Sequence, residues 1–207
     1  MSTNVSDHSM IFAGNVSEIA WSKDSWVFLD IGFANESKSC GLLVGEEEPK
    51  SVQFGDARQR IVQLAKSAKH PLNLVIEAPL SVCFTAAGNP TGRSLEKIGS
   101  KTRYWYAGLG CAVMIAATYL IRDLHTARLG RRIRLFEGFV SFKDRTLASD
   151  HRHDVKSLRE VVLKPESFHD RIIGPDKLRR NPTDLISSAF SVAGMDCGVP
   201  PVICGKA

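Results

Sequence analysis

The sequence lacks the signatures of several large protein classes. Its five cysteines are an odd number among 207 residues and contain no Cys-x-x-Cys pair, which argues against a disulfide scaffold and a zinc ribbon. It has neither a Gly-x-x-x-x-Gly-Lys phosphate loop nor a Gly-x-Ser-x-Gly nucleophile motif. An N-terminal apolar run preceded by basic residues is also missing. We therefore expect a protein of the reducing cytoplasm.

The composition is that of an ordinary globular protein. Hydrophobic residues make up 43% of the chain and charged residues 24%, which excludes disordered, collagen-like and coiled-coil chains. A chain of this length builds one domain with a full core. The polar start of the chain predicts a flexible tail over residues 1–20. We expect a single domain over residues 21–207.

The charge is unevenly distributed. Residues 1–55 carry 3 basic and 8 acidic side chains, whereas residues 56–207 carry 24 basic and 14 acidic ones. The basic excess of the longer part is compatible with a phosphate-rich partner, and we expect that partner to be nucleic acid.

Apolar runs and turn residues predict a mixed α/β order. The pattern indicates strands over 26–32, 39–45 and 51–54, a helix over 56–68, a strand over 72–79, a helix over 104–121, a strand over 132–140, a helix over 153–163, a loop with a short helix over 165–181, a last helix over 184–193 and an extended end over 200–203. Three antiparallel strands followed by two helix-linked parallel strands predict a five-stranded mixed sheet with helices on both faces.

The segment 104–121 has no charged residue over its 18 positions. Its length is the minimum for a transmembrane helix. Two glycines and Thr118 interrupt it, and strands and helices alternate on both sides. We therefore predict a helix buried in a layered domain and no membrane association.

Four acidic residues occupy unusual positions. Asp30, Glu77 and Glu137 lie within otherwise apolar strand segments, and Asp184 begins the predicted last helix. A charge in such a place is costly unless it is paired or binds a cation. The carboxyl ends of neighbouring strands in an open sheet meet in one crevice, so these four residues are predicted to come together there.

Clustered carboxylates repel one another and favour a divalent cation. Oxygen ligands suit Mg²⁺ or Mn²⁺, and two such ions can activate water and stabilise a leaving oxygen in phosphodiester hydrolysis. The alternative is that each acid pairs with one of the many arginines. Both interpretations stay open at the level of the sequence.

These positions resemble the ribonuclease H-like superfamily, in particular its RuvC-like branch. The matching segments are Phe-Leu-Asp-Ile-Gly at 28–32, Ile-Glu-Ala-Pro at 76–79 and an Asp at the start of the last helix. The resemblance covers most of residues 25–193. It implies a ribonuclease H-like sheet and acids on the first strand, the fourth strand and the last helix that hold two Mg²⁺ ions and cleave nucleic acid.

Residues 150–154 read Asp-His-Arg-His-Asp. One interpretation is a metal site or a catalytic histidine, and His151 with Asp154 resembles a His-x-x-Asp pair of RuvC-type resolvases. The other, which we favour from the sequence, is a solvated helix start that Asp150 caps. Sequence neighbours converge on one side of a helix only at a spacing of three or four residues.

The segment 92–106 combines basic and aromatic residues after the strand that carries Glu77. Basic side chains would contact phosphates, and aromatic rings would stack on unpaired bases. The alternative is a loop whose aromatic rings plug the core. The candidate nucleic-acid ligands are Arg93, Lys97, Lys101, Arg103, Tyr104 and Trp105.

The sequence thus predicts a Mg²⁺- or Mn²⁺-dependent nuclease. Asp30, Glu77, Glu137 and Asp184 are the expected catalytic residues, and Asp30, Glu77 and Asp184 the expected metal ligands. We also expect a homodimer. The alternative function is a non-catalytic binding or protein-interaction module with a degenerate acidic site. This alternative rests on Asp184, which stands one turn earlier in the predicted helix than the resemblance implies.

Overall fold

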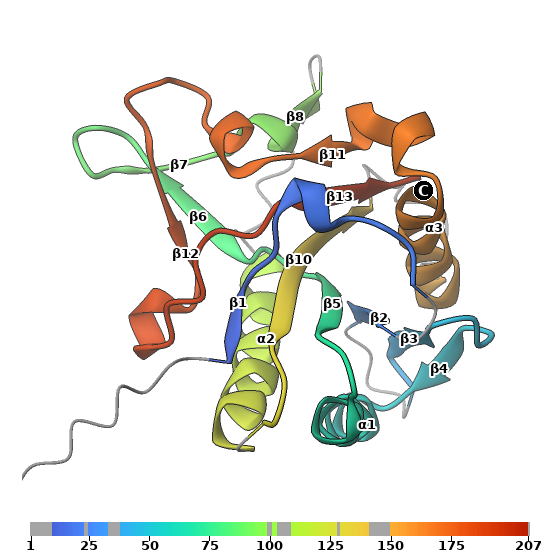
Figure 1. Cartoon of the computed structure of the whole chain (residues 1–207). Helices are drawn as coiled ribbons and strands as arrows, with labels where there is room; N and C mark the ends of the chain where they lie inside the picture. Colours follow the sequence, from blue (N-terminus) through green and yellow to red (C-terminus); the bar gives the residue numbers. More distant parts are fainter. Residues whose placement is uncertain are drawn as a thin grey trace, which may run out of the picture.

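A computed structural model describes residues 10–22, 25–32, 38–98, 101–102, 109–127, 129–140 and 150–206. Its centre is a mixed sheet in the strand order β11-β13-β10-β5-β2-β3-β4, with β1 beside β10 (Figure 1). The bounds of these strands are β1 Ile11–Ala13, β2 Trp26–Ile31, β3 Cys40–Val44, β4 Lys50–Val52, β5 Leu72–Glu77, β10 Ile133–Val140, β11 Ile172–Ile173 and β13 Val202–Gly205.

The strand directions agree with the predicted pattern. β2, β3 and β4 form an antiparallel meander, whereas β5 is parallel to β2 and β10 is parallel to β5. The predicted mixed α/β sheet is therefore confirmed, but it has eight strands instead of the predicted five. The extended C-terminal segment adds β13 parallel to β10, and the short β11 pairs antiparallel with β13 at the edge.

Every residue of β2 and β5 is buried, as expected for central strands covered on both faces. Alternate side chains enter different cores: Val27 and Leu29 contribute to one hydrophobic cluster, and Trp26 and Phe28 to the other. The strand period of two residues thus assigns each side chain to one face of the sheet.

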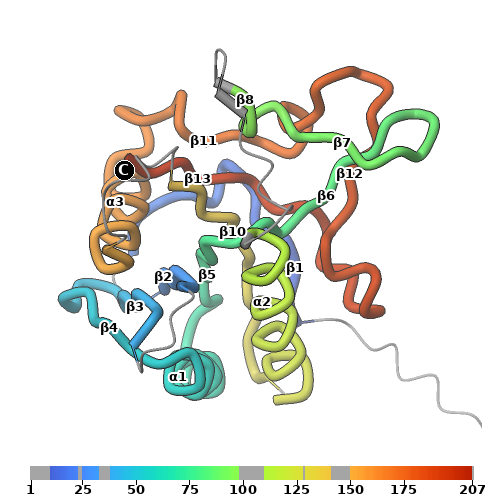
Figure 2. The backbone as a smooth tube through the Cα atoms, turned by 180° about the vertical axis from the view of Figure 1, so that it is seen from behind, coloured from blue at the N-terminus to red at the C-terminus, as the bar shows by residue number. Residues whose placement is uncertain are grey.

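Three long helices cover the sheet. α1 (Phe54–Ser67) and α2 (Leu109–Thr126) supply buried residues to the first cluster, whereas α3 (His151–Leu163) supplies Val155, Leu158, Val161 and Val162 to the second. Figure 2 shows α2 in front of β10, on the face opposite that seen in Figure 1. Residues 109–121 of the uncharged segment are therefore helical and contribute to the core, as predicted, and the helix continues to Thr126. Within the described ranges, none of the helices combines the length and apolar character that crossing a bilayer requires.

An accessory layer lies beside the central sheet. β6 (Ser81–Phe84) pairs with β7 (Pro90–Thr91) and with β12 (Leu185–Ser188) in a small antiparallel sheet. The same layer contains the short helices η2 (Ser94–Glu96) and η4 (Pro175–Leu178), and the hairpin of β8 (Lys97–Ile98) and β9 (Lys101–Thr102). η3 (Pro165–Arg171) follows α3.

Two predictions about local structure are wrong. The predicted last helix over 184–193 is strand β12 followed by the short helix η5 (Ser191–Ala193), because residues 185–188 find a strand partner in β6 about a hundred residues earlier. Within the expected tail over 1–20, Ile11 and Ile19 are buried, and residues 11–13 pair with β10. Residues 1–9 lie outside the described part of the chain.

Candidate metal centre

Two predicted site residues, Asp30 and Glu77, lie side by side at the carboxyl ends of β2 and β5. The two strands are parallel and hydrogen-bonded, with Asp30 opposite Glu77 in the register. Both residues are buried. Their side chains occupy the same face as Phe28 and Val75, which belong to the core beneath α3. The structure therefore brings these two acids together under α3.

Glycines allow the first turn of α3 to approach this edge of the sheet. Gly41 on β3 is the register partner of Asp30. A Cβ atom at Gly41 would overlap the carbonyl oxygen of His151, and one at Gly32 would overlap its ring atom Nε2. Gly41 and Gly32 therefore leave room for the first turn of α3, and a residue with a Cβ atom at either position would prevent this close approach.

The first turn of α3 is capped as the sequence predicts. The Asp150 side chain accepts a hydrogen bond from the backbone N–H of Arg152 at 3.0 Å. Slight burial raises the pKa of Asp150, but its contacts with Arg152 outweigh this effect and lower the pKa. The cap holds the helix start in place, and His151 is the next residue.

The residues after the cap complete a group with Asp30. His151 Nδ1 lies 2.8 Å from Asp30 Oδ2, and one ligand atom each from Asp30, His151 and Asp154 lies within 4.8 Å of the others. Asp30 is 0% exposed and Asp154 2% exposed, whereas the His151 side chain is 25% exposed. Two buried carboxylates and one partly accessible imidazole thus converge on one point.

This donor set fits a divalent cation. Two carboxylates and an imidazole are ligands that Mn²⁺ and other transition metals accept, while the carboxylates alone suit Mg²⁺. Glu77 lies opposite Asp30 on the neighbouring strand, and its Oε1 accepts a hydrogen bond from the backbone N–H of Val140 on β10 at 3.4 Å. The converging ligand atoms belong to Asp30, His151 and Asp154. Asp30 and Asp154 would hold the ion, with His151 either as a further ligand or as the group that orients Asp30.

The thiol of Cys40 borders the same region but does not suit a ligand role. Burial raises the pKa of Cys40, and the negative charge of Asp30 adds to this effect. The side chain is 1% exposed. The raised pKa keeps the Cys40 thiol neutral at physiological pH. Only the thiolate is a good metal ligand, so Cys40 does not suit this role.

Glu137 is not part of this group, contrary to the sequence prediction. It lies opposite Ile76, not Glu77, in the pairing of β10 with β5. Its neighbours along β10 in the same orientation, Ile133 and Leu135, belong to the core beneath α1 and α2. Since the side chains of a strand alternate, Glu137 points to the opposite face from Asp30.

Glu137 instead belongs to a buried ion-pair network. Its Oε2 accepts hydrogen bonds from Arg93 Nη1 and from the backbone N–H of Leu80, each at 2.8 Å. Arg93 also contacts Glu96 Oε1 at 3.2 Å, and Ser81 Oγ accepts from Arg93 Nη1. Burial lowers the pKa of Arg93, but Glu137 and Glu96 outweigh it and raise the pKa, whereas burial raises the pKa of Glu96.

This network also corrects the role assigned to Arg93. The guanidinium is fully buried, so it does not present itself to a phosphate. Within the described chain, the Arg93 guanidinium joins Glu96 and Ser81 of the accessory layer to Glu137 of β10. The prediction failed because an arginine in a loop is usually solvated, and only the fold supplies two buried carboxylates as its partners.

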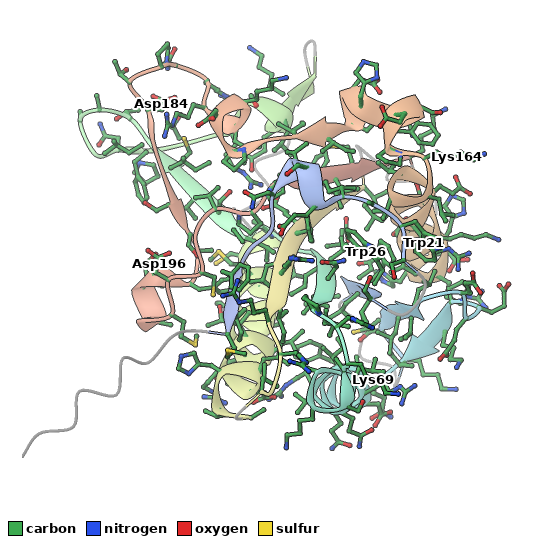
Figure 3. All side chains as sticks on the ribbon, in the orientation of Figure 1. Trp21, Trp26, Lys69, Lys164, Asp184 and Asp196 are labelled. Atoms are coloured by element: carbon green, nitrogen blue, oxygen red, sulfur yellow. The ribbon has the colours of Figure 1, made fainter. Side chains whose placement is uncertain are left out.

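Asp184 is also placed elsewhere. It precedes β12 in the accessory layer, where its Oδ2 accepts from the backbone N–H of Asn181 at 2.9 Å. Figure 3 shows Asp184 on the loop above this layer, well away from Trp26 of β2. With no helix at this position, nothing carries Asp184 to the crevice. Asp184 therefore does not join Asp30 and Glu77, contrary to the prediction that the four acids come together.

The remaining candidate nucleic-acid ligands are only partly described. Lys97 is exposed at the start of β8. Lys101 is in β9, and its side chain is not described. Arg103, Tyr104 and Trp105 lie outside the described residues, so their predicted contacts with phosphates and bases stay predictions.

His151 and Asp154 are more than the solvated helix start that we favoured from the sequence. The cap by Asp150 agrees with that interpretation, but Asp154 is buried. The signal was in the helical period: positions 151, 154, 158 and 161 follow a spacing of three or four residues, and Leu158 and Val161 are core residues. His151 and Asp154 therefore extend the buried stripe of α3 toward the sheet.

Comparison with known proteins adds no family. No family model, no curated protein and no solved structure matches this chain.

Loss of the helix cap gives a first test of how the centre is held. We expect Asp150→Ala to lower the free energy of unfolding by about 1 kcal/mol, because the N–H of Arg152 loses its acceptor. Asp150→Ser, which can still cap, is the matched control and should lose much less. Urea denaturation of the three proteins measures the difference, and equal stabilities of the alanine and serine variants would contradict the capping role.

The same cap predicts a pH dependence. The pKa of Asp150 is lowered in the folded protein, so its stabilising charge is present above the carboxyl pKa of the unfolded chain and is lost as the pH falls through the lowered value. The difference between the parent and Asp150→Ala should therefore shrink in acid. A difference that grows on acidification would contradict this assignment.

Proposed function

We propose that this protein is a metal-dependent nuclease with a ribonuclease H-like fold. The sheet order β4-β3-β2-β5-β10, antiparallel over its first three strands and parallel over the next two, supports this fold. The helices α1 and α2 on one face and α3 on the other are compatible with it.

The observation that carries the proposal is the convergence of Asp30, His151 and Asp154 beside Glu77. These residues come from two adjacent parallel strands and from the helix packed over their ends. The i,i+3 pair His151 and Asp154 resembles the His-x-x-Asp pair of RuvC-type resolvases. The proposed acidic set is therefore Asp30, Glu77 and Asp154, with the helix acid supplied by α3.

The chain's own residues have separable tasks in this proposal. A bound divalent cation would supply Lewis-acid stabilisation of a phosphodiester and a deprotonated water. Asp30 occupies the centre, with Glu77 on the strand side and Asp154 on the helix side. His151 holds Asp30 Oδ2 through Nδ1, and its partly exposed ring stands at the accessible side of the group.

The direct test is cleavage of labelled oligonucleotides by the purified chain. Single-stranded, duplex and branched DNA, and RNA and RNA–DNA hybrids, are incubated with Mg²⁺, with Mn²⁺ or with a chelator. The proposal predicts cleavage of at least one substrate with a metal and none with the chelator. Intact substrates under every metal condition, from a protein shown to be folded, would contradict it.

Metal binding should also stabilise the fold. A cation that binds the folded carboxylates but not the unfolded chain raises stability by RT ln(1 + [L]/Kd), about 2.7 kcal/mol at a hundredfold excess over Kd. We therefore expect millimolar Mn²⁺ or Mg²⁺ to raise the melting temperature by several degrees. The rise should disappear in Asp154→Asn but persist in Asp184→Asn, which lies outside the group. Identical melting curves with metal and with chelator would contradict a metal centre.

The second candidate is a non-catalytic interaction module on the same scaffold. The contact between His151 and Asp30 favours it, because a protonated imidazole would compensate the buried carboxylate without a cation. This candidate predicts neither cleavage nor a metal-induced rise in melting temperature. The two measurements above therefore separate the two functions.

A further inference from the structure

A group of exposed cations lies on the accessory layer, outside the metal centre. We define it as the η2–η4 surface, formed by Lys97, Lys177, Arg179 and Arg180, all of which are exposed. Lys97 directly follows η2, and the other three lie in or just after η4. Figure 1 shows β8, which begins at Lys97, at the outer side of the molecule near this part of the chain.

Two hydrogen bonds join the segments that carry these cations. Ser94 Oγ of η2 donates to the backbone carbonyl of Lys177 at 2.6 Å. Arg180 Nε donates to the backbone carbonyl of Arg93 at 3.3 Å. The fold thus places basic residues from positions about eighty residues apart on one surface.

The acids of the same segments do not neutralise this surface. Glu96 is buried and contacts Arg93, and Asp184 is buried and accepts from Asn181. Asp176 is the exposed acid of residues 174–184. Among the ion pairs between described residues, none involves the four cations of the η2–η4 surface. The surface therefore carries a net positive charge.

We propose that the η2–η4 surface binds the phosphate backbone of the nucleic acid on which the metal centre acts. The proposal takes its substrate from the proposed function. The accessory layer begins with β6, four residues after Glu77, and the network of Arg93 and Glu137 ties it to β10. A nucleic-acid strand bound to this layer would therefore be oriented relative to the carboxyl end of β5, where Glu77 lies. Such contacts give affinity without base specificity.

The test is oligonucleotide binding in a chelator, so that no cleavage is needed. Fluorescence anisotropy is measured with a labelled single strand and a labelled duplex over a series of salt concentrations. The variant Lys97→Ala/Lys177→Ala/Arg179→Ala removes three cations but leaves the Arg180 contact. Lys66→Ala/Lys69→Ala/Arg131→Ala removes three exposed cations elsewhere and serves as the matched control.

The parent protein should bind, and the η2–η4 variant should bind more weakly for every sequence. The slope of log K against log salt should fall by about 2 to 3, because each lost phosphate contact removes about 0.7 to 0.9. The control should keep nearly the parental slope. Melting curves of all three proteins check that they fold equally well.

The outcomes separate this inference from the nuclease proposal. Three results would overturn the proposed role of the surface. These are a parent protein that does not bind, an η2–η4 variant that keeps the parental salt slope, and a control variant whose affinity and slope fall as much as those of the η2–η4 variant. Binding by the parent that the η2–η4 variant weakens, without cleavage when metal is added, would retain the surface and reject the nuclease. Cleavage that the η2–η4 substitutions leave unchanged would retain the nuclease and reject the surface.

Discussion

Asp30→Asn protein is expected to lose metal-dependent cleavage down to the level of a protein-free control. The amide keeps the size of the side chain but removes the charge that a cation shared by Asp30, Asp154 and His151 requires. Asp30 is fully buried between His151 and the strand that carries Glu77, so the substitution acts at the centre of the group. Initial rates on the best substrate of the parent, with Mg²⁺ and with Mn²⁺, measure the loss.

The matched control is Asp184→Asn. It makes the same chemical change at a buried acid, but in the accessory layer, where Asp184 holds Asn181. We expect it to keep most of the activity. The pair also separates the metal centre from the arrangement expected from the sequence, which contains both Asp30 and Asp184. Loss of activity in both variants would favour the sequence-based arrangement, and an active Asp30→Asn would reject both. The circular dichroism spectra of both variants must match that of the parent, which shows that they are folded.

Arg93→Ala should be the most destabilising single change in the accessory layer. Removing one partner of a buried ion pair typically costs about 3–5 kcal/mol, because the remaining charge stays buried without compensation. Here two carboxylates, Glu96 and Glu137, would lose the guanidinium between them. Urea denaturation should show a midpoint far below that of the parent. Lys97→Ala, an exposed cation four residues later, is the control and should stay within about 0.5 kcal/mol.

Acidification should partly rescue Arg93→Ala. Burial already raises the pKa of Glu96 in the parent, so the folded protein binds this proton more readily than the unfolded chain. Stability from such a group is present below the ordinary carboxyl pKa and is lost as the pH rises through the raised value. The stability gap between the variant and the parent should therefore narrow in mildly acidic buffer. A gap independent of pH would indicate that lost packing, and not stranded charge, causes the destabilisation.

The sequence predicted the central strands and the pairing of Asp30 with Glu77 because both depend on local pattern. The segments around 26–31 and 72–77 are apolar almost throughout, and fully buried strands need such segments. An acid at the end of each segment then comes to the same edge when the strands lie parallel and adjacent. The helical period of α3 likewise contained the information that His151 and Asp154 lie on its buried side.

Glu137, Asp184 and Arg93 show what the local pattern could not reveal. The face to which Glu137 points depends on its register against Ile76, and a shift of one residue would have reversed it. Whether residues 185–188 form a helix or a strand was decided by β6, a partner distant in the sequence. Arg93 is buried because two carboxylates from other parts of the fold meet it there. The buried segments can be predicted from the sequence, since burial follows from side-chain chemistry. Which charged groups meet depends on the fold, since register and long-range pairing set the distances on which electrostatic energy depends.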